Sequence, residues 1–309
     1  MRQEFIHPDV FSEIQAAIVP IEQNHSLIEA TNFVGRASAQ HHLEEHIFSR
    51  IEHLLARADK GDKKKLRALK RQALRIQTLL DQANAQLFAS FRTQIKTGAY
   101  ATAQLRQTLR GYSKPVDREE WDDPPRYDDL DTFVDGLLQI EALPRAQREP
   151  EPQMVGYQPT PARIVLDMVE RLGLGSDDVF YDLGSGLGRV AILVALVSGA
   201  RAKGIEFEPV YCSYAQRHAA ALGMSHVTFV NGDAREVKYA DGTVFFLYTP
   251  FKGKILQRVM ELLHYEARTR RIRVCTYGPG ALDILDQDWL ASVDPREPDI
   301  HQVTIFESR

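Results

Sequence analysis

The chain has 309 residues, of which 44% are hydrophobic and 26% charged, with a formal net charge of −4. These fractions are those of an ordinary globular protein, and the small negative charge gives no general attraction to nucleic acid or to membranes. Only two cysteines are present, which excludes a disulfide framework and a cysteine-rich zinc site.

The sequence offers no targeting or membrane-spanning segment. The first residues, MRQEFIHPDVFSEIQ, lack the apolar core of a signal peptide. The longest apolar run, Val190 to Val197, is far shorter than the roughly 20 residues that span a bilayer. We therefore expect a cytoplasmic protein with no membrane association.

Residues 41–110 are predicted to be mainly helical. Apolar residues recur there at spacings of three and four, as in 47–55 and 76–95. A turn is expected at Gly61, between these two runs. The following stretch, 115–131, is acidic and carries prolines, which is typical of a linker or an irregular arm.

A domain boundary is predicted near residue 150. The run FVDGLLQIEAL is expected to form one helix, and the prolines and charges of PRAQREPEPQ cannot continue it. We therefore predict a helical N-terminal domain with an acidic linker at residues 1–150 and a second domain at residues 151–309.

Beyond residue 155, strand-like runs such as VFYDL and VTFV alternate with helical ones. This alternation predicts an α/β fold with a doubly wound, mostly parallel sheet, of seven strands in all. The last two strand-like runs, WLASV and HQVTIFES, have no helix between them. Two such runs fit only an antiparallel pair at the C-terminus.

The stretch VFYDLGSGLGRVAIL, residues 179–193, predicts a strand, a glycine-rich turn and a helix. Glycines let a ligand approach the backbone closely, and dinucleotide sites, phosphate loops and plain tight turns all use them. A dinucleotide site would have a third glycine where Arg189 stands, and the Gly-Lys-Ser/Thr of a phosphate loop is absent. Asp182, just before the glycines, would repel a pyrophosphate and attract a cationic ligand.

Two further acidic residues follow later strands of the predicted sheet. Glu206 ends the next strand, where a carboxylate can accept hydrogen bonds from both ribose hydroxyls. Asp233 follows the third strand, where it could meet the exocyclic amine of an adenine. The ligand so described has an adenine, a free ribose and a positive charge, and no phosphates.

Residues 155–280 resemble a class I S-adenosylmethionine-dependent methyltransferase. The turn DLGSGLG matches the first motif of that family, Glu206 its acidic ribose ligand and Asp233 its adenine-side acid. The resemblance implies S-adenosylmethionine as the cofactor, with no metal. The cofactor-binding residues that it implies are Tyr157, Thr160, Asp182, Gly184, Ser185, Gly186, Gly188, Glu206 and Asp233.

The segment YQPTPARIVLDMVERL precedes the first strand, and Thr160 and Pro161 predict the N-cap and first residue of a helix. In the family, a segment at this place often closes over the methionine part of the cofactor. Tyr157, Gln158 and Thr160 are candidates for that contact. The alternative is that they only cap a helix.

The short sequences PTP, DLGSGLGRV and GIE are similar to those of the Rossmann-type, non-SET histone-lysine methyltransferases and of small bacterial protein-lysine methyltransferases. This likeness implies a protein substrate with a lysine-like nitrogen acceptor. Tyr248 to Phe251 occupy the family's fourth motif, although Tyr248 replaces the usual amide or carboxylate. Tyr248 and Phe251 are the candidate catalytic residues, and Tyr277 is another candidate wall of the acceptor slot. The alternative is that these side chains only pack the strand ends.

Other features were weighed against this function. The segment HLEEH, residues 42–46, fits an inverted zinc-protease motif, but nothing downstream completes it. Residues 57–114 are basic, yet without interleaved aromatic residues nucleic-acid binding is not favoured over a solvated face. The alternatives to a protein methyltransferase are an inactive cofactor-binding scaffold whose helices bind a partner, and an RNA or small-molecule methyltransferase.

Overall fold

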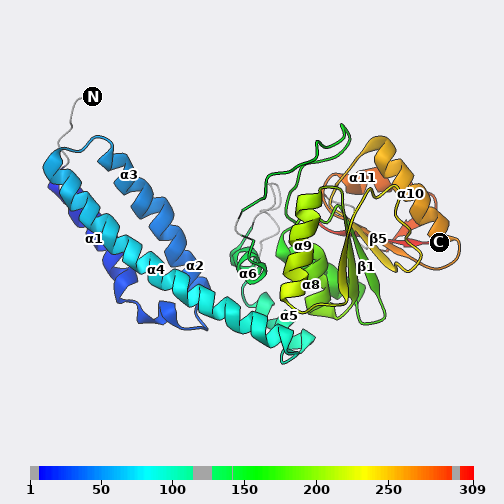
Figure 1. The fold of residues 1–309 in the computed structure, drawn as a ribbon, viewed down its shortest axis with the longest axis horizontal. Helices are drawn as coiled ribbons and strands as arrows, with labels where there is room; N and C mark the ends of the chain where they lie inside the picture. The colour runs from blue at the N-terminus through cyan, green and yellow to red at the C-terminus, as the bar shows by residue number, and fades with distance from the viewer. Residues whose placement is uncertain (1–6, 114–126, 141, 294–299) are drawn as a thin grey trace. The chain divides into compact units, whose positions relative to one another are not determined.

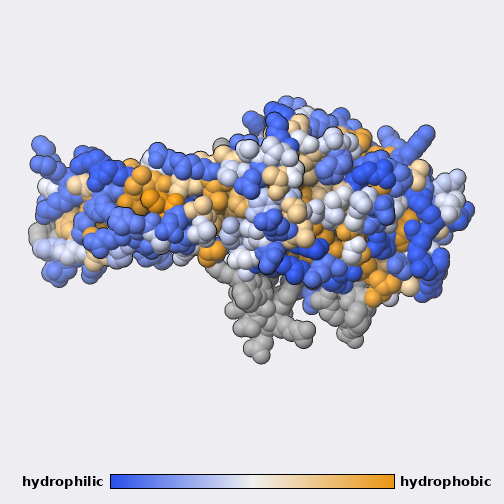
Figure 2. Space-filling view, turned by 90° about the horizontal axis from the view of Figure 1, so that it is seen from below, coloured by the Kyte–Doolittle hydropathy of each residue, from blue (hydrophilic) through white to orange (hydrophobic). Residues whose placement is uncertain are grey.

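The computed structural model describes residues 7–113, 127–140, 142–293 and 300–309. The chain divides into two compact units between Phe91 and Arg92. Hydrophilic side chains form most of the face seen in Figure 2, with apolar ones in patches between them. Among the described helices, none combines the length and the apolar character needed to cross a bilayer.

The first unit is a helical bundle, drawn in blue to cyan in Figure 1. Its apolar core includes Ile18, Ile47 and Leu66, one from each main part of the bundle. The elements in chain order are α1 (Pro8–Gln23), the 3-10 helix η1 (His25–Ile28), α2 (Phe33–His42), the π-helix η2 (Leu43–Phe48), α3 (Ser49–Leu55) and α4 (Lys60–Lys96), which continues beyond the unit.

The turn that we predicted at Gly61 lies earlier, at residues 56–59, and that prediction is wrong. Asp59 Oδ1 accepts a hydrogen bond of 2.7 Å from the backbone nitrogen of Asp62. This side chain therefore satisfies a free donor at the start of α4, as an N-cap does, and Gly61 falls inside the first helical turn.

The second unit contains a seven-stranded sheet in the order β3-β2-β1-β4-β5-β7-β6. The first five strands pair in parallel, and β7 runs antiparallel to both β5 and β6. The predicted α/β sheet with C-terminal antiparallel strands is thus confirmed. The strands are β1 (Val179–Leu183), β2 (Arg201–Glu206), β3 (Val227–Asn231), β4 (Val244–Leu247), β5 (Arg273–Thr276), β6 (Leu290–Ser292) and β7 (Thr304–Ser308).

Helices cover both faces of the sheet (Figure 1). One face packs against α10 through Tyr181, Phe245 and Val259. On the other face α8 lies against β1 and β2, and because α5 and α7 cover it in turn, nearly all of its residues are buried. The helices are α5 (Thr102–Arg110), α6 (Asp129–Leu138), α7 (Ala162–Leu172), α8 (Arg189–Ser198), α9 (Pro209–Ala221), α10 (Gly253–Ala267) and α11 (Gly280–Ile284).

The division of the chain into units differs from the boundary that we predicted near residue 150. Helices α5 and α6 pack on α7 and α8, so they belong with the sheet rather than with the N-terminal bundle. Of the run predicted as one helix at 133–143, residues 133–138 form the later part of α6, which begins earlier, at Asp129, and ends at Leu138. Most of the predicted acidic linker, 114–126, lies outside the described residues.

The N-terminal bundle depends on a buried cation, Arg36, whose side chain has no exposed surface. It donates hydrogen bonds to the Leu27 and Glu29 carbonyls at 2.7 and 2.9 Å and to Asn84 Oδ1 at 2.6 Å. Because its loss would leave buried acceptors unpaired, we expect Arg36→Met to lower the free energy of unfolding by about 3 kcal/mol. Urea denaturation followed by circular dichroism measures this. The exposed Arg50→Met serves as the control, and equal stability of the two variants would contradict the prediction.

Candidate functional site

A cavity of about 570 Å³ lies at the carboxyl ends of the parallel strands. Parallel strands bring their carboxyl ends to one edge of the sheet, so side chains distant in sequence meet there. Gly188 is the one predicted site residue that does not line it. The others do: Tyr157, Gln158, Thr160, Asp182, Gly184, Ser185, Gly186, Glu206, Asp233, Tyr248, Phe251 and Tyr277.

The glycine turn leaves room for two neighbouring segments. Gly184 and Gly186 have φ angles of +81° and +52°, which side chains rarely adopt. A Cβ atom at Gly184 would overlap Pro250, and one at Gly186 would overlap the ring of Tyr157. The turn is therefore in close contact with the segment before α7 and with the loop after β4.

Gly188 does not line the cavity but packs against neighbouring elements. It precedes α8 with φ of +81°, and a Cβ atom there would lie 2.6 Å from both Ala215 and Phe229. The glycine thus lets the start of α8 approach α9 and β3. A direct cofactor contact by Gly188 stays a prediction.

Asp182 ends β1 with a fully buried carboxyl group. Within the described part of the chain its Oδ2 has no hydrogen-bond partner. Burial, together with the nearby charge of Glu206, raises the pKa of Asp182 to about 7. A buried carboxylate with one unpartnered oxygen in a cavity wall favours a cationic group of a ligand.

Glu206 ties the glycine turn to the end of β2. Its Oε2 accepts a hydrogen bond from the Gly186 nitrogen and its Oε1 from the Glu208 nitrogen, both at 2.7 Å. Burial raises the pKa of Glu206, although these two donors oppose the rise. Each carboxylate oxygen has a second acceptor position, so hydroxyl groups of a ligand can still bind.

Asp233 is held differently. The Arg235 side chain donates to Oδ1 at 2.9 Å and to Oδ2 at 3.0 Å, and the Arg235 backbone nitrogen donates to Oδ1 at 2.8 Å. This hydrogen bonding lowers the pKa of Asp233, and Arg235 also contacts Glu151. The carboxylate is already largely engaged, so its contact with an adenine amine stays a prediction.

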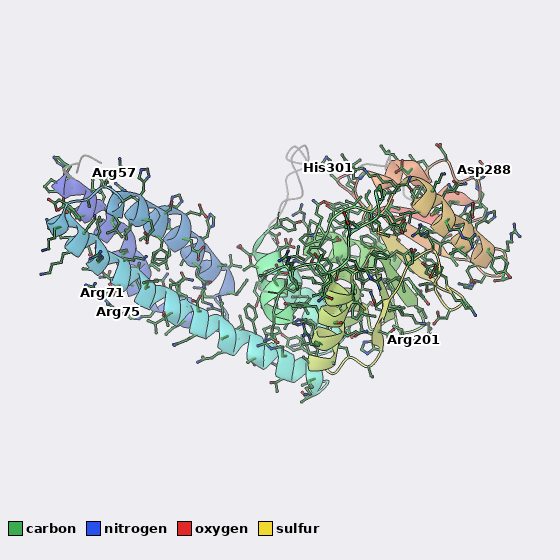
Figure 3. All side chains as sticks on the ribbon, turned by 45° about the horizontal axis from the view of Figure 1, so that its top comes forward. Arg57, Arg71, Arg75, Arg201, Asp288 and His301 are labelled. Carbon is green, nitrogen blue, oxygen red and sulfur yellow. The ribbon has the colours of Figure 1, made fainter. Side chains whose placement is uncertain are left out.

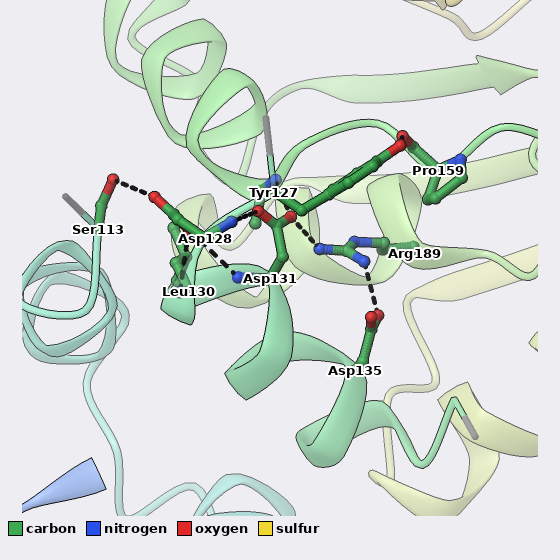
Figure 4. Close-up of polar contacts among 9 residues, drawn as sticks. Ser113, Tyr127, Asp128, Leu130, Asp131, Asp135, Pro159 and Arg189 are labelled. Carbon is green, nitrogen blue, oxygen red and sulfur yellow. Dashed lines mark hydrogen bonds and ion pairs between the residues drawn. The ribbon is translucent and has the colours of Figure 1, made fainter. Parts of the chain in front are cut away.

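Sequence reasoning missed a buried ion cluster beside the turn (Figure 4). Arg189, the first residue of α8, lines the cavity and is 3% exposed. It forms ion pairs with Asp131 and, at 2.6 Å, with Asp135, both on α6. Burial outweighs the attraction of Arg189 and raises the pKa of Asp131 to about 6. We had used Arg189 only as evidence against a dinucleotide site.

The same cluster corrects the predicted start of α7. The N-cap position belongs to Pro161, and Thr160 is a buried part of the cavity wall. Asp131 Oδ1 accepts the hydrogen bond from the Ala162 nitrogen at 2.8 Å. The acceptor that Thr160 was expected to supply thus comes from another helix. Asp128 and Asp131 form a capping box at the start of α6. Their spacing in the sequence is the signal that could have predicted this helix start.

The segment before α7 is fastened along the edge of the cavity. The Val155 nitrogen donates to the Pro250 carbonyl at 3.0 Å, and the Tyr127 hydroxyl donates to the Pro159 carbonyl at 2.8 Å (Figure 4). Tyr157 lies between these two fastenings, against the glycine turn. A contact of Tyr157 with the methionine part of the cofactor stays a prediction.

The loop after β4 forms another part of the cavity wall. The rings of Tyr248 and Tyr277 are 4.7 Å apart between centroids. Between Tyr248 and Pro250, Thr249 adopts a left-handed φ of +43°, and its Oγ1 accepts a hydrogen bond from the Gly280 nitrogen at 2.9 Å. Such strain is held in place only by the surrounding contacts and is concentrated at functional sites.

Phe251 belongs both to this wall and to the hydrophobic core. Its side chain is buried and it forms a bridge with Met154. Packing is therefore part of its role, as one alternative held, and a contact with the acceptor stays a prediction.

The possible zinc motif at residues 42–46 and the two cysteines have no feature of a catalytic site among the described residues. Residues 42–46 cross from α2 into η2, and in the described chain no cluster of three metal-binding side chains is found. Cys212 and Cys275 are buried, and burial raises their thiol pKa values to about 11 and about 12. Both thiols are therefore protonated at neutral pH and are poor nucleophiles.

Residues 154–262 match the family model described as Histone methylation protein DOT1. A curated relative, the protein-lysine N-methyltransferase of Saccharolobus islandicus (strain REY15A), is 31% identical over 111 residues, which cover 35% of this chain and 65% of that protein. The match thus spans less than two thirds of the relative's length.

Among solved structures, the RNA methyltransferase of Salinibacter ruber in complex with S-adenosyl-L-homocysteine has a TM-score of 0.39 and 28% identity, covering 49% of this chain and 92% of that one. The precorrin-6y C5,15-methyltransferase of Geobacter metallireducens GS-15 has a TM-score of 0.38 and 18% identity, covering 50% and 92%. The family match, which lies within the second unit, and the curated relative confirm the resemblance drawn from the sequence: residues 154–262 are similar to class I S-adenosylmethionine-dependent methyltransferases.

The cavity fits S-adenosylmethionine. The unpartnered Asp182 oxygen suits the ammonium group of the methionine part, and Glu206 has free acceptor positions for ribose hydroxyls. The buried Ser185 hydroxyl also has no partner among the described residues. When bound, the cofactor would supply a methyl group activated by its sulfonium.

We expect the affinity for S-adenosylmethionine to rise about tenfold between pH 6 and pH 8. Asp182 has a raised pKa of about 7, so its carboxyl group is mostly protonated at pH 6 and must lose that proton to pair with an ammonium group. Calorimetry at pH 6.5 in buffers of different ionisation enthalpy should detect the released proton. Asp182→Asn should bind weakly and without this pH dependence; a pH-independent affinity of the native protein would remove Asp182 from this role.

Gly186→Val should abolish cofactor binding while leaving most of the fold. The new side chain would occupy the space of the Tyr157 ring at a φ that strains any residue other than glycine. Calorimetry and circular dichroism measure the two effects. Gly199→Val is the matched control, because Gly199 also has a positive φ, +76°, but a Cβ atom there meets nothing within 4 Å. Normal binding by Gly186→Val would show that the turn does not hold the cofactor.

Proposed function

We propose that this protein transfers the methyl group of S-adenosylmethionine to a nitrogen atom of a protein side chain, with lysine as the acceptor. The observation that carries the proposal is a pair of tyrosines, Tyr248 and Tyr277, in the wall of the same cavity as Asp182. The names of the matching family model and of the curated relative support a protein acceptor.

The chemistry needs alignment more than covalent help. Methyl transfer is an in-line displacement, so the protein has to hold the nucleophile, the methyl carbon and the sulfur in a row and keep competing water out. The largely apolar walls and the fastened segment around Tyr157 are suited to this. Faces of aromatic rings such as those of Tyr248 and Tyr277 also attract an approaching alkylammonium group.

Tyr248 is suited to orienting an amine rather than to removing its proton. Burial, with smaller contributions from Tyr277 and Tyr127, raises the pKa of its hydroxyl above the ordinary value. The phenol therefore stays neutral in the physiological range and can accept a hydrogen bond from the amine. A lysine acceptor has to lose its proton before it attacks, since only the neutral amine is a nucleophile.

The backbone of the acceptor loop supports the same role. Thr249 is held in its left-handed conformation by the Gly280 nitrogen and by its own hydrogen bond to the Tyr277 carbonyl at 3.3 Å. These contacts join the two tyrosines through one residue and fix the direction in which Tyr248 leaves the strand. A fixed hydroxyl is worth more to alignment than a mobile one.

We expect Tyr248→Phe to lower kcat about tenfold or more and to leave the affinity for S-adenosylmethionine unchanged. The substitution removes only the hydroxyl that orients the acceptor, so it should lower kcat and not cofactor binding. Below the amine's pKa, near 10.4 when unperturbed, the logarithm of the native rate should rise with pH at a slope of one. Tyr265→Phe, an exposed residue on α10, is the control. Full turnover by Tyr248→Phe would contradict the assigned role.

The acceptor itself is tested with a cell lysate and S-adenosylmethionine labelled in the methyl group. Hydrolysis of the labelled protein fraction should yield methylated lysine, in amounts that fall with Tyr248→Phe and with Gly186→Val. Label found only in nucleic acid or small molecules would overturn the protein acceptor. No label in any fraction, despite cofactor binding, would support the inactive scaffold instead.

A further inference from the structure

The outer face of α4 carries five cations in a row, here called the basic stripe. Their spacings of three and four residues place them on one side of the helix, and all five are exposed. The opposite side of α4, with Leu66, Ala73 and Ile76, is buried in the bundle. The basic stripe consists of Lys60, Lys64, Arg67, Arg71 and Arg75, of which Figure 3 labels the last two on α4.

The charge of this helical segment departs strongly from that of the chain. From residue 60 to 75 there are eight lysines and arginines and one acid, Asp62, whereas the whole chain has a net charge of −4. Two cations beside the stripe have partners, Lys65 with Asp62 and Lys70 with Glu52. For the five cations of the basic stripe, no ion pair with a described residue exists.

The arrangement does not serve the stability of the helix. Like charges three and four residues apart repel each other and destabilise a helix, and here the repulsion is repeated along the whole stripe. No acid on that face of α4 between residues 60 and 75 offsets it. The basic stripe is thus unfavourable for folding. Its even spacing suits a ligand with repeated negative charges.

We propose that the basic stripe binds the phosphate backbone of nucleic acid without reading its bases. The stripe extends over about 22 Å at 1.5 Å per residue, a length that covers six or seven phosphates along a strand. Three of its five members are arginines, whose planar guanidinium groups bind phosphate oxygens through two parallel hydrogen bonds. The exposed aromatic residues that would stack on single-stranded bases are absent from the stripe, which favours duplex.

An anionic membrane fits the stripe less well. Basic helices that lie on membranes insert an apolar face, and the apolar face of α4 is buried in the bundle. The exposed apolar residues near the stripe, Leu74 and Leu79, are two separate side chains. An acidic protein surface would likewise need a buried apolar centre to bind tightly, which a row of cations does not provide.

The experiment measures binding of the full-length protein to a fluorescent 20-base-pair DNA duplex over a salt series. Five neutralised phosphates predict a slope of about −4.5 in log affinity against log salt, an approximately 500-fold loss from 50 to 200 mM. The stripe variant Arg67→Gln, Arg71→Gln, Arg75→Gln should reduce the slope to about −1.8. Its thermal stability should be equal or higher, since repulsion is removed.

The matched control is Arg50→Gln, Lys65→Gln, Lys70→Gln, which removes the same charge from paired positions outside the stripe. It should keep the native slope. Equal slopes for the native protein and the stripe variant, or an equal loss in both variants, would overturn the proposal, as would no binding at 50 mM salt. Tighter binding at equal salt to phosphatidylserine-containing vesicles or to polyglutamate than to duplex would assign the stripe to a membrane or to an acidic protein instead. The result is independent of methyl transfer.

Discussion

One buried carboxylate, that of Asp131, connects the parts of the second unit that enclose the cavity. Its Oδ2 accepts from the Asp128 nitrogen at the start of α6, while its Oδ1 accepts from the Ala162 nitrogen at the start of α7 and pairs with Arg189 at the start of α8. Three helix N-termini thus converge on one side chain. Burial raises the pKa of Asp131, while Arg189 and the backbone donors of Ala162 and Asp128 lower it, and the result is a pKa of about 6.

Three carboxylates of the cavity wall, those of Asp182, Glu206 and Asp233, differ in pKa because their surroundings differ. Asp182 is buried without a full set of partners and its pKa is raised, whereas Asp233 is paired with Arg235 and its pKa is lowered. Glu206 lies between these cases, with burial opposed by two backbone donors. The strongest site for a cationic group is therefore at the end of β1, where the unpartnered Asp182 oxygen can accept its hydrogen bond. The three carboxylates therefore differ both in charge state and in place along the cavity wall.

Much of the sheet and of the cavity could be predicted because both follow from local patterns. The alternation of strand and helix runs predicts the parallel sheet, and strand ends then bring Asp182 and Glu206 together without further information. The pairing of Arg189 with α6 could not be predicted, since 189 and 131 are distant in sequence and neither position has a periodic signal. The left-handed Thr249 was equally hidden, because tertiary contacts and not its residue type impose that conformation.

The glycine turn and the loop after β4 are joined by packing contacts and by one hydrogen-bonded segment. Gly184 lies against Pro250 and Gly186 against Tyr157, and the segment around Tyr157 is itself hydrogen-bonded to the Pro250 carbonyl through Val155. Movement of the Tyr157 ring would therefore act on a segment that is bonded to the loop after β4. Packed contacts of this kind do not deform continuously, so the position of this segment and the shape of the loop depend on each other. The glycines thus let the two walls of the cavity touch.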